Sequence, residues 1–119
     1  MAVSGAESVR IYVTRDGERP FEEWMHRLKD VEAQDRILAR LERIRFGLPG
    51  DCKSVGEGVS EFRVDVGPGY RVYFGEDGRS IVVLLCGGSK ARQRRDIADA
   101  KAFWKDYRNR QDAKKRTVR

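Results

Sequence analysis

The apolar positions of this chain recur first with the period of a strand and then with that of a helix. Residues 8–14 (SVRIYVT) are a short run rich in β-branched side chains that ends in the turn-like RDGER, which predicts a strand. After Pro20, a residue suited to the first turn of a helix, apolar residues follow at helical spacing. A second helical stripe covers residues 31–46, with Gly47 just past its end. The chain therefore begins with a predicted strand and two predicted helices.

The middle of the chain predicts three consecutive strands. EFRVDV (61–66) and YRVYF (70–74) both alternate apolar and polar residues, and the turn GPG separates them. SIVVLLC (80–86) is apolar at nearly every position, as is typical of a central strand covered on both sides. The preceding Gly-rich stretch GLPGDCKSVGEG (47–58) lacks the phosphate-binding spacing of a P-loop, so we interpret it as a connecting loop.

A third helix is predicted from about Gln93, because one apolar stripe follows it, whereas residues 111–119 have no stripe and are predicted to fray. The element order is then β-α-α-β-β-β-α. Helices that precede an antiparallel meander favour an α+β fold with a mainly antiparallel sheet and helices packed on one sheet face. The length favours one domain over residues 1–119, with a core at about 9–108 and a basic tail at 109–119.

Strand parity places four polar side chains on one face of the central hairpin. Arg63, Asp65, Arg71 and Tyr73 share this face, while apolar residues occupy the other. If GPG is a three-residue turn, Asp65 lies opposite Arg71 and Arg63 lies opposite Tyr73. Arginine holds phosphate bidentately, so the face is a candidate phosphate site, although an ordinary solvated face with one ion pair fits the pattern too. We expect Arg71 to point away from the core, so that Arg71→Ala leaves the fold intact.

Positive charge is concentrated at the end of the chain. Residues 89–119 carry 12 Lys/Arg and 4 Asp/Glu, a balance of +8, whereas the chain as a whole carries +6. Such asymmetry favours a polyanionic or acidic partner, although a solvated basic helix is the plainer interpretation. Two glycines, 87 and 88, permit close backbone approach just before a cationic segment around the start of the third helix. Cations are disfavoured at a helix N-terminus unless an anion binds there.

Several classes of protein do not fit this sequence. No apolar run reaches the roughly 18 residues of a membrane helix, and the first ten residues lack the features of a secretory signal. Cys52 and Cys86 form no C-x-x-C pair, which indicates reduced thiols in a cytoplasmic protein. The single histidine, His26, lies in the first predicted helix, and we interpret it as structural or surface-exposed. We expect no metal and no other cofactor.

The element order, the G-x-x-E-[FL]-R strand, the GPGYRVYF hairpin and the LLCGGSK strand end together resemble the RelE/HigB superfamily. The resemblance is closest to its phage-derived addiction module killer branch and covers about residues 9–105. It implies a RelE-like fold and a toxin of a type II toxin–antitoxin pair. Such a toxin enters the ribosome and cuts mRNA without a metal, by attack of a 2′-hydroxyl on the adjacent phosphate. The implied partners are the ribosome, mRNA and a cognate helix-turn-helix antitoxin, with no membrane and no small-molecule cofactor.

The resemblance also implies site residues. Arg63 matches a position that is basic in the ribonuclease members, Arg71 matches their arginine after G-Y, and Lys90 lies in the basic segment after the last strand. The predicted catalytic residues are Arg63, Arg71, Tyr73 and Lys90, and the predicted RNA-binding residues are Lys53, Arg92, Arg94 and Arg95. Arg71 and Lys90 would stabilise the developing charge, and Arg63 would orient the phosphate. The candidates for accepting the proton are Tyr73, Lys90 and Asp65.

Two departures from the family pattern leave alternatives open. Asp65 stands where a second basic residue is expected, and the tyrosine that RelE carries early in its last helical segment has no clear match near Asp96. One alternative is a ParE-like protein that inhibits DNA gyrase by protein–protein contact. The other is a basic module that binds RNA or the ribosome without cleaving.

Overall fold

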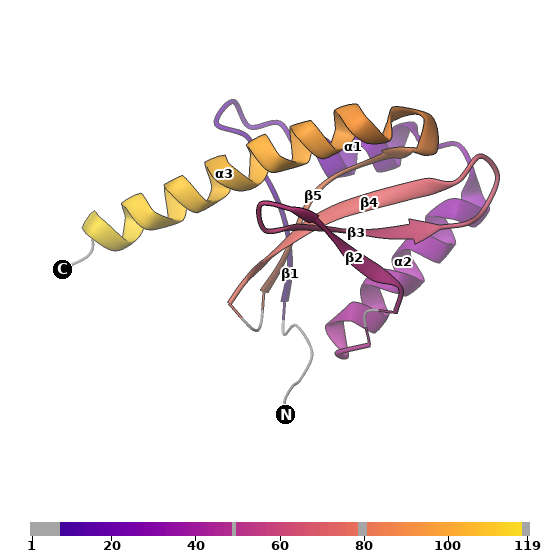
Figure 1. The fold of residues 1–119 in the computed structure, drawn as a ribbon, viewed down its shortest axis with the longest axis horizontal. Coiled ribbons are helices and arrows are strands. Elements are labelled where there is room, and N and C mark those ends of the chain that lie inside the picture. The colour runs from indigo at the N-terminus through magenta and orange to yellow at the C-terminus, as the bar shows by residue number, and fades with distance from the viewer. Residues whose placement is uncertain (1–7, 49, 79–80, 118–119) are drawn as a thin grey trace.

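Five strands and three helices make up the part of the protein that the structure describes (Figure 1). The computed structural model describes residues 8–48, 50–78 and 81–117. The elements are β1 (Ser8–Ile11), α1 (Pro20–Arg27), α2 (Val31–Arg45), β2 (Cys52–Gly56), β3 (Val59–Val64), β4 (Tyr70–Asp77), β5 (Ile81–Ser89), a 3-10 turn η1 (Lys90–Arg92) and α3 (Gln93–Thr117). The sheet order is β1-β5-β4-β3-β2, with β1 parallel to β5 and the other neighbours antiparallel. The α+β class and the mainly antiparallel sheet are thus confirmed.

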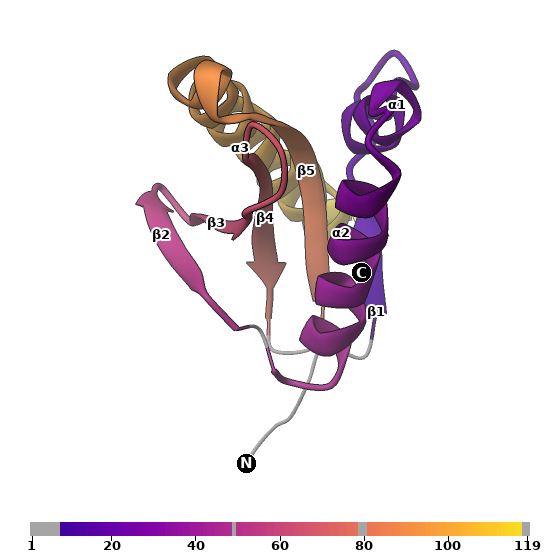
Figure 2. The same cartoon turned by 90° about the vertical axis from the view of Figure 1, so that its right-hand side faces the viewer.

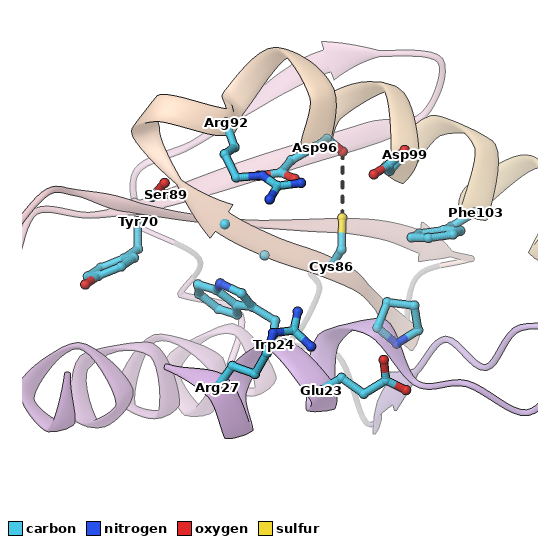
Figure 3. A pocket seen from close by; sticks show the side chains of 13 residues that line it. Glu23, Trp24, Arg27, Tyr70, Cys86, Ser89, Arg92, Asp96, Asp99 and Phe103 are labelled. Atoms are coloured by element: carbon cyan, nitrogen blue, oxygen red, sulfur yellow. Dashed lines mark hydrogen bonds between the residues drawn. The ribbon is translucent and has the colours of Figure 1, made fainter. Parts of the chain in front are cut away.

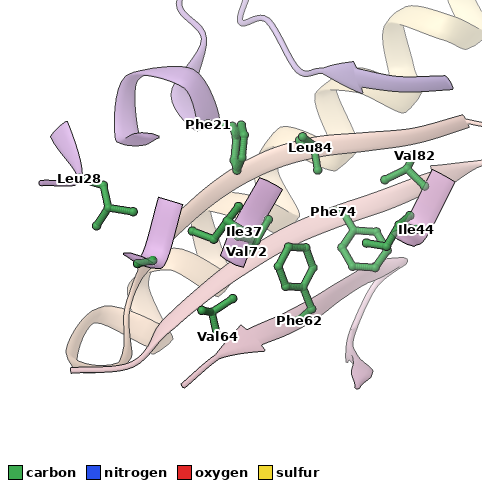
Figure 4. Packing of buried hydrophobic residues seen from close by; sticks show 11 residues of the cluster. Phe21, Leu28, Ile37, Ile44, Phe62, Val64, Val72, Phe74, Val82 and Leu84 are labelled. Atoms are coloured by element: carbon green, nitrogen blue, oxygen red, sulfur yellow. The ribbon is translucent and has the colours of Figure 1, made fainter. Parts of the chain in front are cut away.

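The helices cover both faces of this sheet (Figure 2). Helices α1 and α2 pack on one face, around a cluster that includes Phe21, Ile37, Phe62 and Phe74 (Figure 4). The other face packs against α3 through Val59, Tyr73, Val83, Leu85, Ala100 and Trp104. The prediction that the helices share one sheet face is therefore wrong. Both faces of the central strands carry apolar side chains, and each needs its own cover.

β2 was not predicted, because its segment looked like a Gly-rich loop. Residues Cys52–Gly56 pair antiparallel with β3, and a register shift follows Ser54. The strand lies at the edge of the sheet, and Lys53 and Ser54 are exposed. An edge strand needs few apolar residues, so it leaves a weak hydrophobic signal in the sequence.

The hairpin between β3 and β4 has a longer turn than predicted. Val64 pairs with Tyr70 and Arg63 with Arg71, so residues 65–69 lie outside both strands. The predicted pairings of Asp65 with Arg71 and of Arg63 with Tyr73 are wrong by a shift of two residues. A shift of two keeps every side chain on its predicted face, since side chains alternate with a period of two.

A register shift between β4 and β5 lies next to the candidate site. Tyr73 pairs with Cys86 while Phe74 pairs with Leu84, which leaves Leu85 as an extra residue in β5. Leu85 and Cys86 consequently both belong to the cluster under α3. Such a bulge changes the direction in which the following side chains point. Residue 80 of the predicted strand 80–86 lies outside the described residues.

α3 continues to Thr117 and extends well past the sheet (Figure 1). Asp106 holds it to the start of the chain, accepting hydrogen bonds from the Tyr12 hydroxyl at 2.6 Å and from Arg15 Nε at 2.9 Å. The prediction that the chain frays from residue 111 is wrong for residues 111–117, while residues 118–119 lie outside the described part. No helix in the described ranges is long and apolar enough to cross a membrane.

Candidate nucleic-acid interface

Two rows of residues cross the sheet beside the start of α3. Lys53, Glu61, Tyr73 and Cys86 pair in sequence across β2, β3, β4 and β5. Arg63, Arg71 and Gly88 form the next row on the same face. Because neighbouring strands lie about 4.8 Å apart, the sheet brings the predicted residues Lys53, Arg63 and Arg71 into one group.

Glu61 lies at the centre of this group and was not singled out from the sequence. Its carboxylate is 1% exposed and lies 3.8 Å from Arg71 Nε and 3.9 Å from Lys53 Nζ. Gln93 Nε2, at the start of α3, donates a hydrogen bond to it at 3.3 Å. The available signal was parity, since Glu61 precedes Arg63 by two residues and must share its face.

Arg71 is buried, which contradicts the expectation that it points away from the core. Only 6% of the residue is exposed, because α3 covers the face on which it lies. Arg63, directly opposite on β3, is exposed, and its Nη2 lies 3.9 Å from the carboxylate of Asp51, which is more exposed still. The pair therefore consists of one arginine fixed inside the protein and one open to solvent.

Tyr73 does not lie on an open face either. It is fully buried, and among the described residues its hydroxyl has no hydrogen-bond partner. Burial, helped by the negative charges of Glu61 and Asp96, raises the pKa of the phenol far above neutral pH. A buried, protonated phenol cannot take a proton from a substrate at the surface. The prediction of Tyr73 as a surface proton acceptor is wrong, because α3 was expected to leave this face uncovered.

The other predicted cations are exposed around the start of α3. The Lys90 amide donates to the carbonyl of Gly69 at 3.0 Å, which places Lys90 next to the β3–β4 turn. Arg92, Arg94 and Arg95 line a shallow depression on η1 and the first turn of α3. These four residues therefore surround the helix start, while Lys53 and Arg63 lie on the strands beside it. An anion at the helix start stays a prediction.

A cleft of about 340 Å³ opens at the end of β5, between α1 and α3 (Figure 3). Its floor contains Gly87 and Gly88, where a Cβ would lie 2.4 Å from the Trp24 ring and 1.8 Å from Asp96 Oδ2, respectively. Asp96 is 7% exposed, and burial raises its pKa, against the opposing charge of Arg92. Within the described ranges, no three His, Cys, Asp or Glu side chains are grouped to hold a metal ion.

The fold and this surface define an α+β protein whose sheet carries a buried Glu61–Arg71 pair beside exposed cations. No protein-family model matches the chain. An uncharacterized protein of Haemophilus influenzae (strain ATCC 51907 / DSM 11121 / KW20 / Rd) is 47% identical over 81 residues, covering 68% of this chain and 82% of that protein. The chain belongs to the same family as this Haemophilus protein.

Proposed function

We propose that this protein is a RelE-like toxin of a type II toxin–antitoxin pair and that it cuts mRNA on the ribosome. The observation that carries the proposal is the pairing of Arg63 with Arg71 across β3 and β4, with Lys53 on the neighbouring strand. Together these three cations outnumber the buried Glu61 carboxylate between them, so the group keeps a positive charge that suits a phosphodiester, which arginine binds through two parallel hydrogen bonds. The proposed site of action is the cytoplasm, where ribosomes are found.

The exposed cations would bind the scissile phosphate, while the buried Arg71 balances the carboxylate of Glu61 behind them. Arg63 and Lys53 reach solvent, whereas Arg71 is held in place by Glu61. The 2′-hydroxyl of the RNA would lose its proton to a base and attack the adjacent phosphorus, while the bond to the 5′-oxygen breaks and that oxygen takes a proton from water, leaving a cyclic phosphate and a free 5′-hydroxyl. Preorganised positive charge stabilises the extra negative charge of that transition state. Of the proton acceptors considered, Lys90 and Asp65 are exposed to solvent, whereas Tyr73 is buried.

The experiment is primer extension on a reporter mRNA after brief induction of the full chain. We expect cuts inside translated codons for the unmodified protein and their loss with Arg63→Ala. Arg45→Ala is the matched control, because Arg45 is a half-exposed arginine on α2 that pairs with Glu42 at 3.2 Å. Cuts of equal intensity with Arg63→Ala would remove Arg63 from the site.

A second candidate is a protein that binds RNA or the ribosome without cleaving it. The burial of Tyr73 favours this candidate, because it leaves the exposed group with one proton acceptor fewer. Arrested translation with intact mRNA would support it. Intact mRNA together with inhibited DNA supercoiling would instead support a ParE-like gyrase inhibitor.

A cognate antitoxin is part of the proposal. The surface around Lys90, Arg92, Arg94 and Arg95 is cationic and exposed, so a partner with an acidic segment would fit it. Covering that surface would also keep the toxin from RNA.

A further inference from the structure

A second cationic surface lies on the other side of β3, against α2. It is a groove of about 390 Å³ between α2 and the end of β3. Four arginines and one carboxylate line it, namely Arg36, Arg40, Arg43, Arg63 and Asp65. The proposed function uses only Arg63 among these arginines.

The three helical arginines share one side of α2, because their positions differ by four and three residues. Arg40 has a structural task. Its guanidinium donates to the carbonyl of Arg63 at 3.0 Å and to that of Asp51 at 3.1 Å, and it lies 4.7 Å from the centre of the Phe62 ring. Arg40 thereby fixes α2 to β3 where the β2 pairing ends, since Cys52 is the first residue of β2 and pairs with Phe62.

Arg36 and Arg43 are exposed above this fixed base. Arg36 pairs with Glu32 at 3.1 Å, and both side chains are more than half exposed. A surface pair of this kind contributes little to stability, so a phosphate can replace the carboxylate at small cost. The groove can therefore offer at least two guanidinium groups to a ligand without disturbing the contacts of Arg40.

We propose that this groove binds the phosphodiester backbone of single-stranded RNA, as an extension of the site on the sheet face. Arg63 lines the groove and also belongs to the row with Arg71. The positively charged surface is therefore continuous from the sheet face to the groove, and one RNA strand can follow it. The exposed guanidinium groups of Arg36 and Arg43 suit successive phosphates of one chain, because arginine matches phosphate geometry. The choice of RNA over an acidic protein segment rests on the proposed function.

The test measures binding of a fluorescent 2′-O-methyl RNA 12-mer to the full chain by anisotropy at several KCl concentrations. This probe lacks the attacking hydroxyl, so binding is measured without cleavage. We expect Arg36→Gln/Arg43→Gln to weaken binding on the order of 10-fold at 0.1 M salt and to reduce the salt slope by about 1.4, or ~0.7 for each lost phosphate contact.

The control, Arg19→Gln/Arg45→Gln, removes the same charge outside the groove. Both control arginines are half exposed and pair with nearby glutamates: Arg19, just before α1, with Glu22, and Arg45 of α2 with Glu42. The control should keep the affinity and salt slope of the unmodified protein within about 3-fold. Equal losses in both double variants would mean that net charge alone drives binding, which would overturn the proposal.

Two further outcomes separate the groove from the proposed function. If the unmodified protein cuts mRNA but Arg36→Gln/Arg43→Gln binds the RNA probe normally, the groove proposal is wrong and the function stands. If no mRNA is cut while that variant still loses RNA affinity selectively, the function is wrong and the groove stands. Loss of binding to a poly-glutamate peptide with unchanged RNA binding would assign the groove to an acidic protein and overturn the RNA proposal.

Discussion

Arg71 has a structural role that follows from the burial of Glu61. A carboxylate that is 1% exposed must be paired, and its fixed partners are the Arg71 guanidinium and Gln93. Lys53 also approaches it, but the lysine side chain is more than half exposed. Removing Arg71 therefore leaves a buried negative charge without its main partner. This corrects the expectation that Arg71→Ala leaves the fold intact.

The first prediction concerns this pair. Arg71→Ala should lower the free energy of unfolding by about 3 kcal/mol, because an uncompensated charge remains inside the protein. Arg63→Ala, on the exposed member of the same cross-strand pair, should change it by less than about 1 kcal/mol. Urea denaturation followed by circular dichroism measures both values. Equal, small effects would mean that Glu61 is stabilised by other groups.

Asp96 should make stability depend on pH in an unusual direction. Burial raises its pKa, so the native protein holds this proton more tightly than the unfolded chain, in which the pKa is about 3.9. The resulting stability is present below that value and is lost as pH rises through the native pKa. Asp96→Asn should therefore gain stability relative to the unmodified protein between pH 4 and pH 7, measured by urea denaturation at each pH.

Asp106→Asn is the contrasting control for that pH series. Burial alone would raise the pKa of Asp106, but hydrogen bonds from Tyr12 and Arg15 and the charge of Arg110 hold it below its usual value. The stability that Asp106 contributes is present above the unfolded pKa and is lost as pH falls. Asp106→Asn should therefore have a lower free energy of unfolding than the unmodified protein at neutral pH, and this difference should shrink in acid. If the stability of both variants changed with pH in the same way, the raised pKa of Asp96 would be contradicted.

At the scale of elements, the sequence predicted those with a strong apolar period. Both N-terminal helices and the three central strands are present, since each has a stripe or an alternation long enough to recognise. β2 has neither, and only its pairing with β3 makes it a strand. The five-residue turn was missed because the three residues GPG are enough to reverse the chain direction. Which residues then pair depends on contacts between the strands, and a local sequence pattern does not show these.

The length of α3 was missed for a related reason. No apolar stripe continues past Tyr107, yet Asp106 and Arg110 form an ion pair at 2.8 Å, and Arg110 donates to the carbonyl of Val13. These polar contacts hold the helix to the segment after β1, and the exposed turns beyond them continue the helix.

Removing the end of α3 tests how much its last turns stabilise the fold. Deleting residues 111–119 should lower the free energy of unfolding by about 1 kcal/mol or less, because residues 112–116 are exposed. Trp104→Ala should instead cost about 3–5 kcal/mol, since Trp104 is buried against the sheet. Thermal and urea denaturation compare the two. A large loss in the truncated protein would mean that the last turns stabilise the fold.

For the whole molecule, the decisive feature is that one sheet supports two separate cores. The apolar run at residues 80–86 already indicated that both faces of this strand are covered. The face on which the third helix packs, however, depends on the sheet order, in which β5 lies between β1 and β4. Two of the four predicted catalytic residues, Arg71 and Tyr73, are buried because α3 covers their face of the sheet. No local pattern in the hairpin reveals that a helix some twenty residues away covers this face.

Because both cores share β4 and β5, the molecule should unfold in one step. Trp24 packs against the α1–α2 core and Trp104 belongs to the α3 core, so each reports one side. In Trp24→Phe and in Trp104→Phe, the fluorescence of the remaining tryptophan should change at the same urea concentration as the circular dichroism. A fluorescence transition that comes first in either variant would identify a core that opens independently.

The close contacts between glycines and helix side chains should leave a trace in how this family diverges. A Cβ on Gly75 would lie 2.4 Å from the Trp104 ring, as one on Gly87 would from Trp24. A side chain at either glycine would force a helix away from the sheet while the tryptophan is present, and a smaller side chain in place of the tryptophan would leave a cavity above the glycine. Positions 75 and 104 should therefore covary among relatives, and so should positions 87 and 24, with a side chain appearing on the strand only where the helix has lost its tryptophan.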